Sequence, residues 1–84
     1  MKLTKAEKAW VAEVQAALDK CPSTHLGFAT TGDHDLTIFD IRGMDKICAL
    51  LNRGGYDFIP AADKLGLVAD ECLNFPQPVE STAG

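Results

Sequence analysis

The stretch that decides the fold is His25–Arg42, HLGFATTGDHDLTIFDIR. Its middle, Gly32-Asp33-His34-Asp35, is made of residues that favour tight turns, and strand-forming residues stand on both sides. Residues 26–29 alternate large and small side chains, whereas residues 36–41 are apolar on both faces of a strand. The stretch therefore predicts a β-hairpin whose second strand is central in the sheet or covered on both faces.

The residues before the hairpin predict one amphipathic helix. Thr4 and Glu7 have the spacing of a capping box, and Pro22 ends the pattern. Between them, apolar residues recur at steps of three and four, as on a helix with one buried face. We expect Trp10 to anchor this helix in the core, and a contact with a partner is the alternative role for its ring.

The residues after the hairpin predict further helical cover. A second helix is expected over Met44–Arg53, stopped by Gly54-Gly55. A short third strand is expected at Tyr56–Ile59, followed by a helix from Pro60 to Phe75. The expected core is Trp10, Val14, Leu18, Leu26, Phe28, Ile38, Phe39, Ile41, Ile47, Leu51, Phe58, Leu65 and Leu67.

These elements define a fold class, a small single α+β domain over residues 1–75. The expected order is helix, β-hairpin, helix, short strand, helix, with the helices packed on a small antiparallel sheet. Residues 76–84 contain Pro76 and Pro78 among small polar residues and are expected to form a flexible C-terminal tail.

The composition is that of a soluble globular domain, with 46% hydrophobic and 24% charged residues in a chain of 84. No apolar run approaches the ~20 residues that a membrane span needs. Charges interrupt the first ten residues, MKLTKAEKAW, so that they do not read as a signal peptide. We therefore expect a cytoplasmic protein without membrane contact.

The net charge of −4 is unevenly distributed. Residues 1–20 carry +1 and residues 21–84 carry −5, and after Gly54 only Lys64 opposes five acidic residues. Nucleic-acid binding draws much of its affinity from basic side chains, and no basic stripe is present. A nucleic-acid partner is therefore not expected, although an acidic flank could attract a basic protein surface.

Residues 60–75, PAADKLGLVADECLNF, have the spacing of a helix-turn-helix, with a small residue at Ala62 and a glycine at Gly66. A DNA-binding regulator is thus an alternative function. However, the would-be recognition helix from Val68 carries Asp70 and Glu71 and no Lys or Arg, and it would repel phosphates. A simple helix and turn is the preferred interpretation.

Few side chains in the sequence could take part in catalysis or metal binding. Asp33, His34 and Asp35 form the densest polar cluster, which makes a small enzyme or metal site at this turn a second alternative. Adjacent residues of a tight turn point in different directions, and no supporting motif exists, so we expect a solvated turn, no catalytic residues, no metal and no cofactor.

Cysteine usage gives no site either. The three cysteines, Cys21, Cys48 and Cys72, are widely spaced. Cys21 and His25 could contribute to a zinc site, but we expect three reduced thiols in the core instead.

The phrases LGFATTGDHDLTIFDI (residues 26–41) and YDFIPAADKLGL (residues 56–67) resemble small uncharacterised accessory proteins of temperate phages and enterobacterial prophages. The resemblance implies a non-enzymatic protein that binds a host or phage macromolecule. We expect a protein partner, bound through an acidic or apolar patch. A homodimer that completes the sheet across an unpaired edge strand is left open. The expected binding residues are Asp33, His34, Asp35, Asp63, Asp70 and Glu71.

Overall fold

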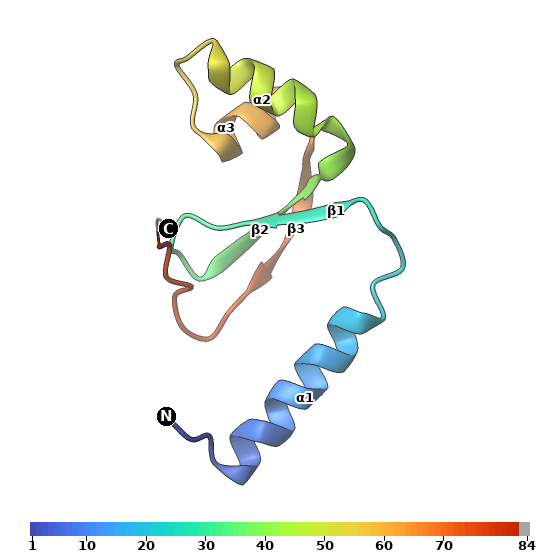
Figure 1. The fold of residues 1–84 in the computed structure, drawn as a ribbon, viewed down its shortest axis with the longest axis vertical. Coiled ribbons are helices and arrows are strands. Elements are labelled where there is room, and N and C mark those ends of the chain that lie inside the picture. The colour runs from blue at the N-terminus through green and yellow to red at the C-terminus, as the bar shows by residue number, and fades with distance from the viewer. Residues whose placement is uncertain (83–84) are drawn as a thin grey trace.

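The computed structural model describes residues 1–82 and confirms a small α+β domain. The elements are α1 (Lys5–Asp19), β1 (Leu26–Ala29), β2 (Asp35–Asp40), a 3-10 turn η1 (Ile41–Gly43), α2 (Met44–Asn52), α3 (Phe58–Lys64) and β3 (Val68–Asn74). The three strands form one antiparallel sheet in the order β1-β2-β3. Helices α2 and α3 lie on one side of the sheet and α1 lies on the other (Figure 1).

The hairpin has the predicted position. Phe28 pairs with Ile38 and Gly27 pairs with Phe39, so that alternate residues face opposite sides of the sheet. Gly27 is required by close packing, because a Cβ atom there would lie 2.6 Å from the ring of Phe39 and would also overlap Ile41. The second strand of the hairpin was predicted to be central or covered on both faces. β2 is central in the sheet, but only the face toward α2 and α3 is covered.

The third strand was predicted at the wrong place. Residues 58–64 form α3, with Pro60 in its first turn, where a missing N–H is tolerated. The helix ends before Gly66, whose φ of +72° suits a left-handed stop. The chain then returns as β3 and pairs with β2, Leu73 lying opposite Leu36. Pairing to a free edge outweighs the weak strand propensity of this polar segment.

The core lies between the sheet and the pair α2 and α3. Phe39, Ile47, Ala61 and Ala62 are buried, and the ring of Phe58 packs on Phe39. Partly buried residues surround them: Ala29, Leu50, Leu51, Leu67 and Val68. The two alanines let α3 approach α2 closely, which explains how so short a helix seals the core.

Five residues of the predicted core are instead exposed: Trp10, Leu18, Phe28, Ile41 and Leu65. Trp10 and Leu18 belong to α1, which contains no buried residue. The predicted capping box of this helix is confirmed, since the Thr4 hydroxyl accepts from the Glu7 N–H and the Glu7 carboxylate accepts from the Thr4 N–H. The helix therefore forms as expected, but without the expected cover.

No helix among residues 1–82 is long and apolar enough to cross a membrane.

Candidate functional site

The turn between β1 and β2 binds the segment that follows β3. The His34 ring is 3.0 Å from the Phe75 carbonyl oxygen through Nδ1, and the Phe75 N–H donates to the His34 carbonyl. The Val79 N–H donates to the Asp33 carbonyl over 3.0 Å. These contacts give the turn a structural task, which is to hold residues 75–79 against the hairpin.

The predicted acidic binding residues do not gather in one place. Asp35 lies opposite Asn74 at one end of β3, whereas Asp63 lies in the last turn of α3, before β3 begins. Asp70 and Glu71 lie exposed along β3 between them. Among the described residues, no group of three His, Cys, Asp or Glu side chains could hold a metal ion. The six predicted residues thus form no common site.

The three cysteines are free, but they are exposed rather than in the core as predicted. Cys21 follows α1, and its thiol contacts the Ser23 carbonyl oxygen at 3.4 Å. Cys48 follows the buried Ile47 on α2 but is itself exposed, and Cys72 lies on the edge strand β3. Helical spacing had placed Cys48 in the apolar stripe of α2, yet of this stripe only Ile47 is fully buried.

The helix-turn-helix alternative is contradicted. Residues 68–74, where a recognition helix would begin, form β3. The preferred interpretation of a helix and turn is confirmed in its first part, over residues 58–64. The Asp40 N–H donates to the Leu67 carbonyl, so residue 67 already makes a main-chain hydrogen bond with the end of β2.

An ion pair that the sequence analysis missed lies at the end of β2. The Asp40 carboxylate accepts from both Nε and Nη2 of Arg42, at 3.0 and 2.8 Å, and from the Arg42 backbone N–H at 2.9 Å. These bonds to Arg42 lower the pKa of Asp40 to about 2 and raise the pKa of Arg42. Asp40 thereby caps η1, and its spacing to Arg42, two residues apart, was the available signal.

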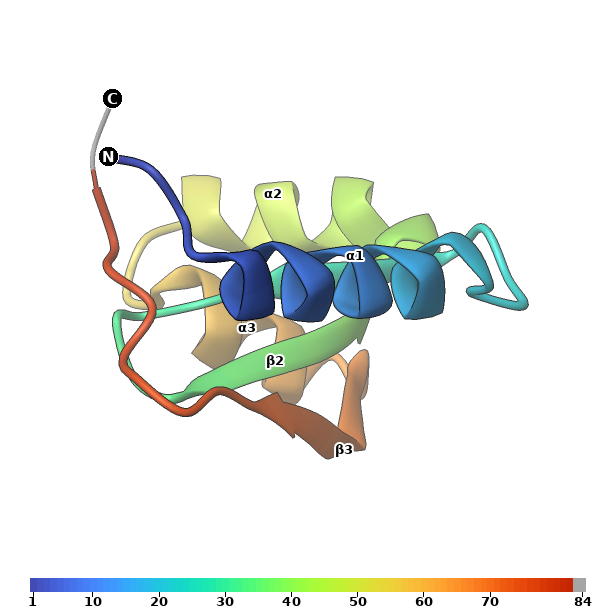
Figure 2. The same cartoon turned by 90° about the horizontal axis from the view of Figure 1, so that it is seen from below.

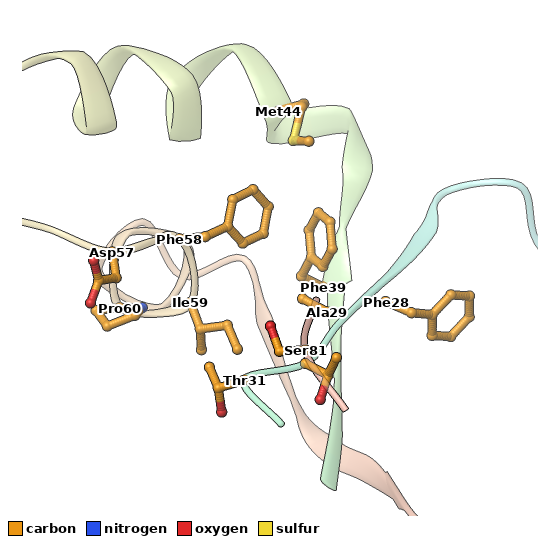
Figure 3. Close-up of a pocket in the computed structure, with 11 residues that line it drawn as sticks. Phe28, Ala29, Thr31, Phe39, Met44, Asp57, Phe58, Ile59, Pro60 and Ser81 are labelled. Atoms are coloured by element: carbon orange, nitrogen blue, oxygen red, sulfur yellow. The ribbon is translucent and has the colours of Figure 1, made fainter. Parts of the chain in front are cut away.

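A groove with a volume of about 720 Å³ lies beside β1. It is bounded by residues 28–31 of the hairpin, by the start of α2, by the start of α3 and by Ser81 of the C-terminal segment. Figure 3 shows the rings of Phe39 and Phe58 adjacent to each other, Met44 above them and Ile59 directed toward Thr31. Its lining is mostly apolar, and the carboxylate of Asp57 lies at one end.

The outer edge of β1 adjoins this groove. In the sheet β1 pairs with β2 alone, so its other edge has no strand beside it within residues 1–82. The groove could not be predicted because its walls come from separate segments of the chain: the hairpin, the starts of α2 and α3, and Ser81. The one available signal was the aromatic and aliphatic cluster at Phe58 and Ile59, which was interpreted as a strand.

No protein-family model, curated protein or solved structure matches the chain. The resemblance to phage and prophage accessory proteins therefore stays a prediction.

Proposed function

We propose that this protein is a small binding protein that takes an extended segment of another protein into the groove beside β1. The observation that supports this proposal most directly is the combination of an apolar groove with an unpaired strand edge. A partner segment lying there can donate and accept main-chain hydrogen bonds along β1 and place alternate side chains against Phe39 and Phe58.

Charge favours a basic partner segment. The chain carries a net charge of −4, and Asp57 lies at the groove. Complementary charge speeds encounter and selects among partners more than it adds affinity. The partner segment is therefore an extended stretch with apolar side chains at every second position and Lys or Arg at its ends.

An enzymatic function receives no comparable support from the described residues. The groove is lined by one carboxylate and several hydroxyl side chains, and the histidine of the turn is bonded to the Phe75 carbonyl. A nucleophile with an adjacent base, which hydrolytic chemistry requires, is not assembled there.

The test uses a displayed library of random twelve-residue peptides selected against the full chain. The expected result is enrichment of peptides with alternating apolar residues and basic ends. Met44→Glu, at the groove, should weaken their binding at least tenfold. Leu65→Glu is the matched control, because Leu65 is similarly exposed (38% against 41%) but does not line the groove.

Two results would contradict the proposal: no enrichment above an empty support, or enriched peptides that bind Met44→Glu as well as the unchanged protein. Amide chemical shifts of Phe28, on β1, and of Thr30, directly after β1, supply a second measurement. They should move on peptide binding if the peptide adds to this strand edge.

A further inference from the structure

Helix α1 carries an apolar side that nothing in the described chain covers. Trp10 is 53% exposed, Leu18 is 51% exposed, and Val14 between them is half-buried. Four-residue spacing places these three side chains in one stripe, while Ala12 and Lys8 lie on other sides of the helix. A helix with such a stripe in a small domain ordinarily packs it against another element.

The sheet has an apolar face that is equally uncovered. Phe28 pairs with Ile38 and Leu36 pairs with Leu73, and these residues face away from α2 and α3 because Gly27, Phe39 and Val68 face toward them. Phe28 is 47% exposed and Leu73 is 39% exposed. In Figure 3 the Phe28 ring points away from Phe39 and Phe58, so this face lies on the other side of the sheet from most of the groove, and Phe28 borders both.

The exposed area of the chain is too large for a molecule of this mass that functions alone. The accessible surface is 6648 Å², whereas a folded monomer of 9.0 kDa exposes about 4,900 Å². The radius of gyration is 15.3 Å, against about 12 Å for a compact chain of this length. The excess of about 1,800 Å² exceeds the roughly 800 Å² that each partner buries in a stable protein interface.

From these observations we infer that a second copy of this chain covers both surfaces, with α1 of each copy packed on the open sheet face of the other. The two surfaces belong to one chain and are joined by residues 20–25, and α1 diverges from its own sheet (Figures 1 and 2). A two-fold axis lets one contact occur twice, so that neither surface remains exposed on either copy.

Charge supports exchange between copies. The segment with α1, residues 1–20, carries +1, whereas residues 21–84 carry −5. Exchange therefore places residues 1–20 on the negative body of the partner, although their net positive charge comes from Lys2 and Lys20, which flank α1, and α1 itself carries −1. Phe28 belongs both to the covered face and to the lining of the groove beside β1, whereas the rest of the groove faces α2 and α3. The mass measurement below tests the inference separately from the proposed function.

The first experiment measures mass by light scattering over a hundredfold range of protein concentration. The expected mass is about 18 kDa, twice the 9.0 kDa of one chain. Leu18→Glu should weaken the dimer by about a hundredfold, because the change occurs in both helix contacts. Ala12→Glu places the same side chain on the opposite side of α1 and should leave the mass at about 18 kDa.

A mixing experiment distinguishes exchange of α1 from pairing of two α1 helices. Leu18→Glu places a charge on the apolar stripe of α1, and Phe28→Glu places a charge on the open face of the sheet. In the mixture, the intact helix of the Phe28→Glu chain meets the intact face of the Leu18→Glu chain. The mixture should therefore dimerise at least tenfold more tightly than either variant alone, while circular dichroism confirms that both variants are folded.

Three outcomes would overturn the inference. A mass near 9 kDa at every concentration would mean that α1 closes on its own sheet or meets a different protein. A dimer that Leu18→Glu leaves unchanged would use another surface. A mixture no tighter than its components would indicate contact between two α1 helices.

Discussion

The rings of Phe39 and Phe58 meet edge to face, with centroids 5.1 Å apart and planes at 77°. Phe39 comes from the central strand β2 and Phe58 from the first residue of α3, so this contact joins the sheet to the helical layer. It also forms one wall of the groove beside β1. The same pair therefore serves the core and the proposed binding surface.

Replacing Phe58 should test the stability that this contact supplies. Phe58→Leu keeps an apolar side chain but loses the aromatic pair, and we expect the free energy of unfolding to fall by about 1–1.5 kcal/mol. Urea denaturation at a fixed protein concentration measures it. Tyr56→Leu, at an exposed position two residues earlier, is the control and should change stability by less than about 0.5 kcal/mol. Equal effects of the two variants would contradict the prediction.

A second contact sets the distance between η1 and the start of β3. Gly43 has an ordinary φ of −91°, yet a Cβ atom there would overlap the side chain of Leu67. Gly43→Ala should therefore lower the free energy of unfolding by about 1–3 kcal/mol through overpacking rather than backbone strain.

The double variant Gly43→Ala/Leu67→Ala tests whether overlap with Leu67 causes the loss of stability in Gly43→Ala. Removing the Leu67 side chain opens room for the new methyl group, so the double variant should lose at least about 1 kcal/mol less than the sum of the two single variants. Strict additivity would show that the methyl group meets something other than Leu67.

The hairpin and the first two helices could be predicted because their signals are local. The turn residues 32–35, the capping box at Thr4 and the glycines after α2 each act over a few residues. The third strand could not be predicted in this way. The residues of β3 have weak strand propensity, and they become a strand because the free edge of β2 is available to them.

The exposure of the apolar side of α1 was not predicted, for a different physical reason. An amphipathic pattern shows which side of a helix is apolar, but it does not show which other surface packs against that side. Trp10 was accordingly assigned to the core and is 53% exposed. The candidate site was missed because the groove depends on how β1, α2 and α3 approach each other, and none of the six predicted polar residues lines it; the His34 ring instead contacts the Phe75 carbonyl oxygen.

The ion pair between Asp40 and Arg42 should make stability depend on pH at the acid end. The folded pKa of Asp40, about 2, lies below its ordinary value of 3.8, so the pair stabilises the fold above the ordinary value. This contribution is lost progressively as pH falls from about 4 toward 2. Carboxyl titration by NMR should show the pKa of Asp40 at about 2, below its ordinary value of 3.8.

Arg42→Gln should raise the pKa of Asp40 only part of the way back. The side-chain bonds from the guanidinium disappear, but the backbone N–H of residue 42 still donates to the carboxylate. The pH dependence of the melting temperature between pH 2 and 4 should become shallower. An unchanged Asp40 titration in this variant would show that the guanidinium does not hold the carboxylate in solution.

The capping box gives a prediction confined to α1. Thr4→Ala removes the hydroxyl that accepts from the Glu7 N–H at 3.1 Å, which costs a helix about 1 kcal/mol. Amide hydrogen exchange in the first turn of α1 should become about fivefold faster. Thr4→Ser keeps the acceptor and should exchange like the unchanged protein. Because no residue of α1 is buried against the rest of its own chain, exchange at Ile47 in α2 should stay the same at a fixed protein concentration. Equal acceleration at Ile47 would mean that the first turn of α1 and the core open together, contrary to the local role assigned to this cap.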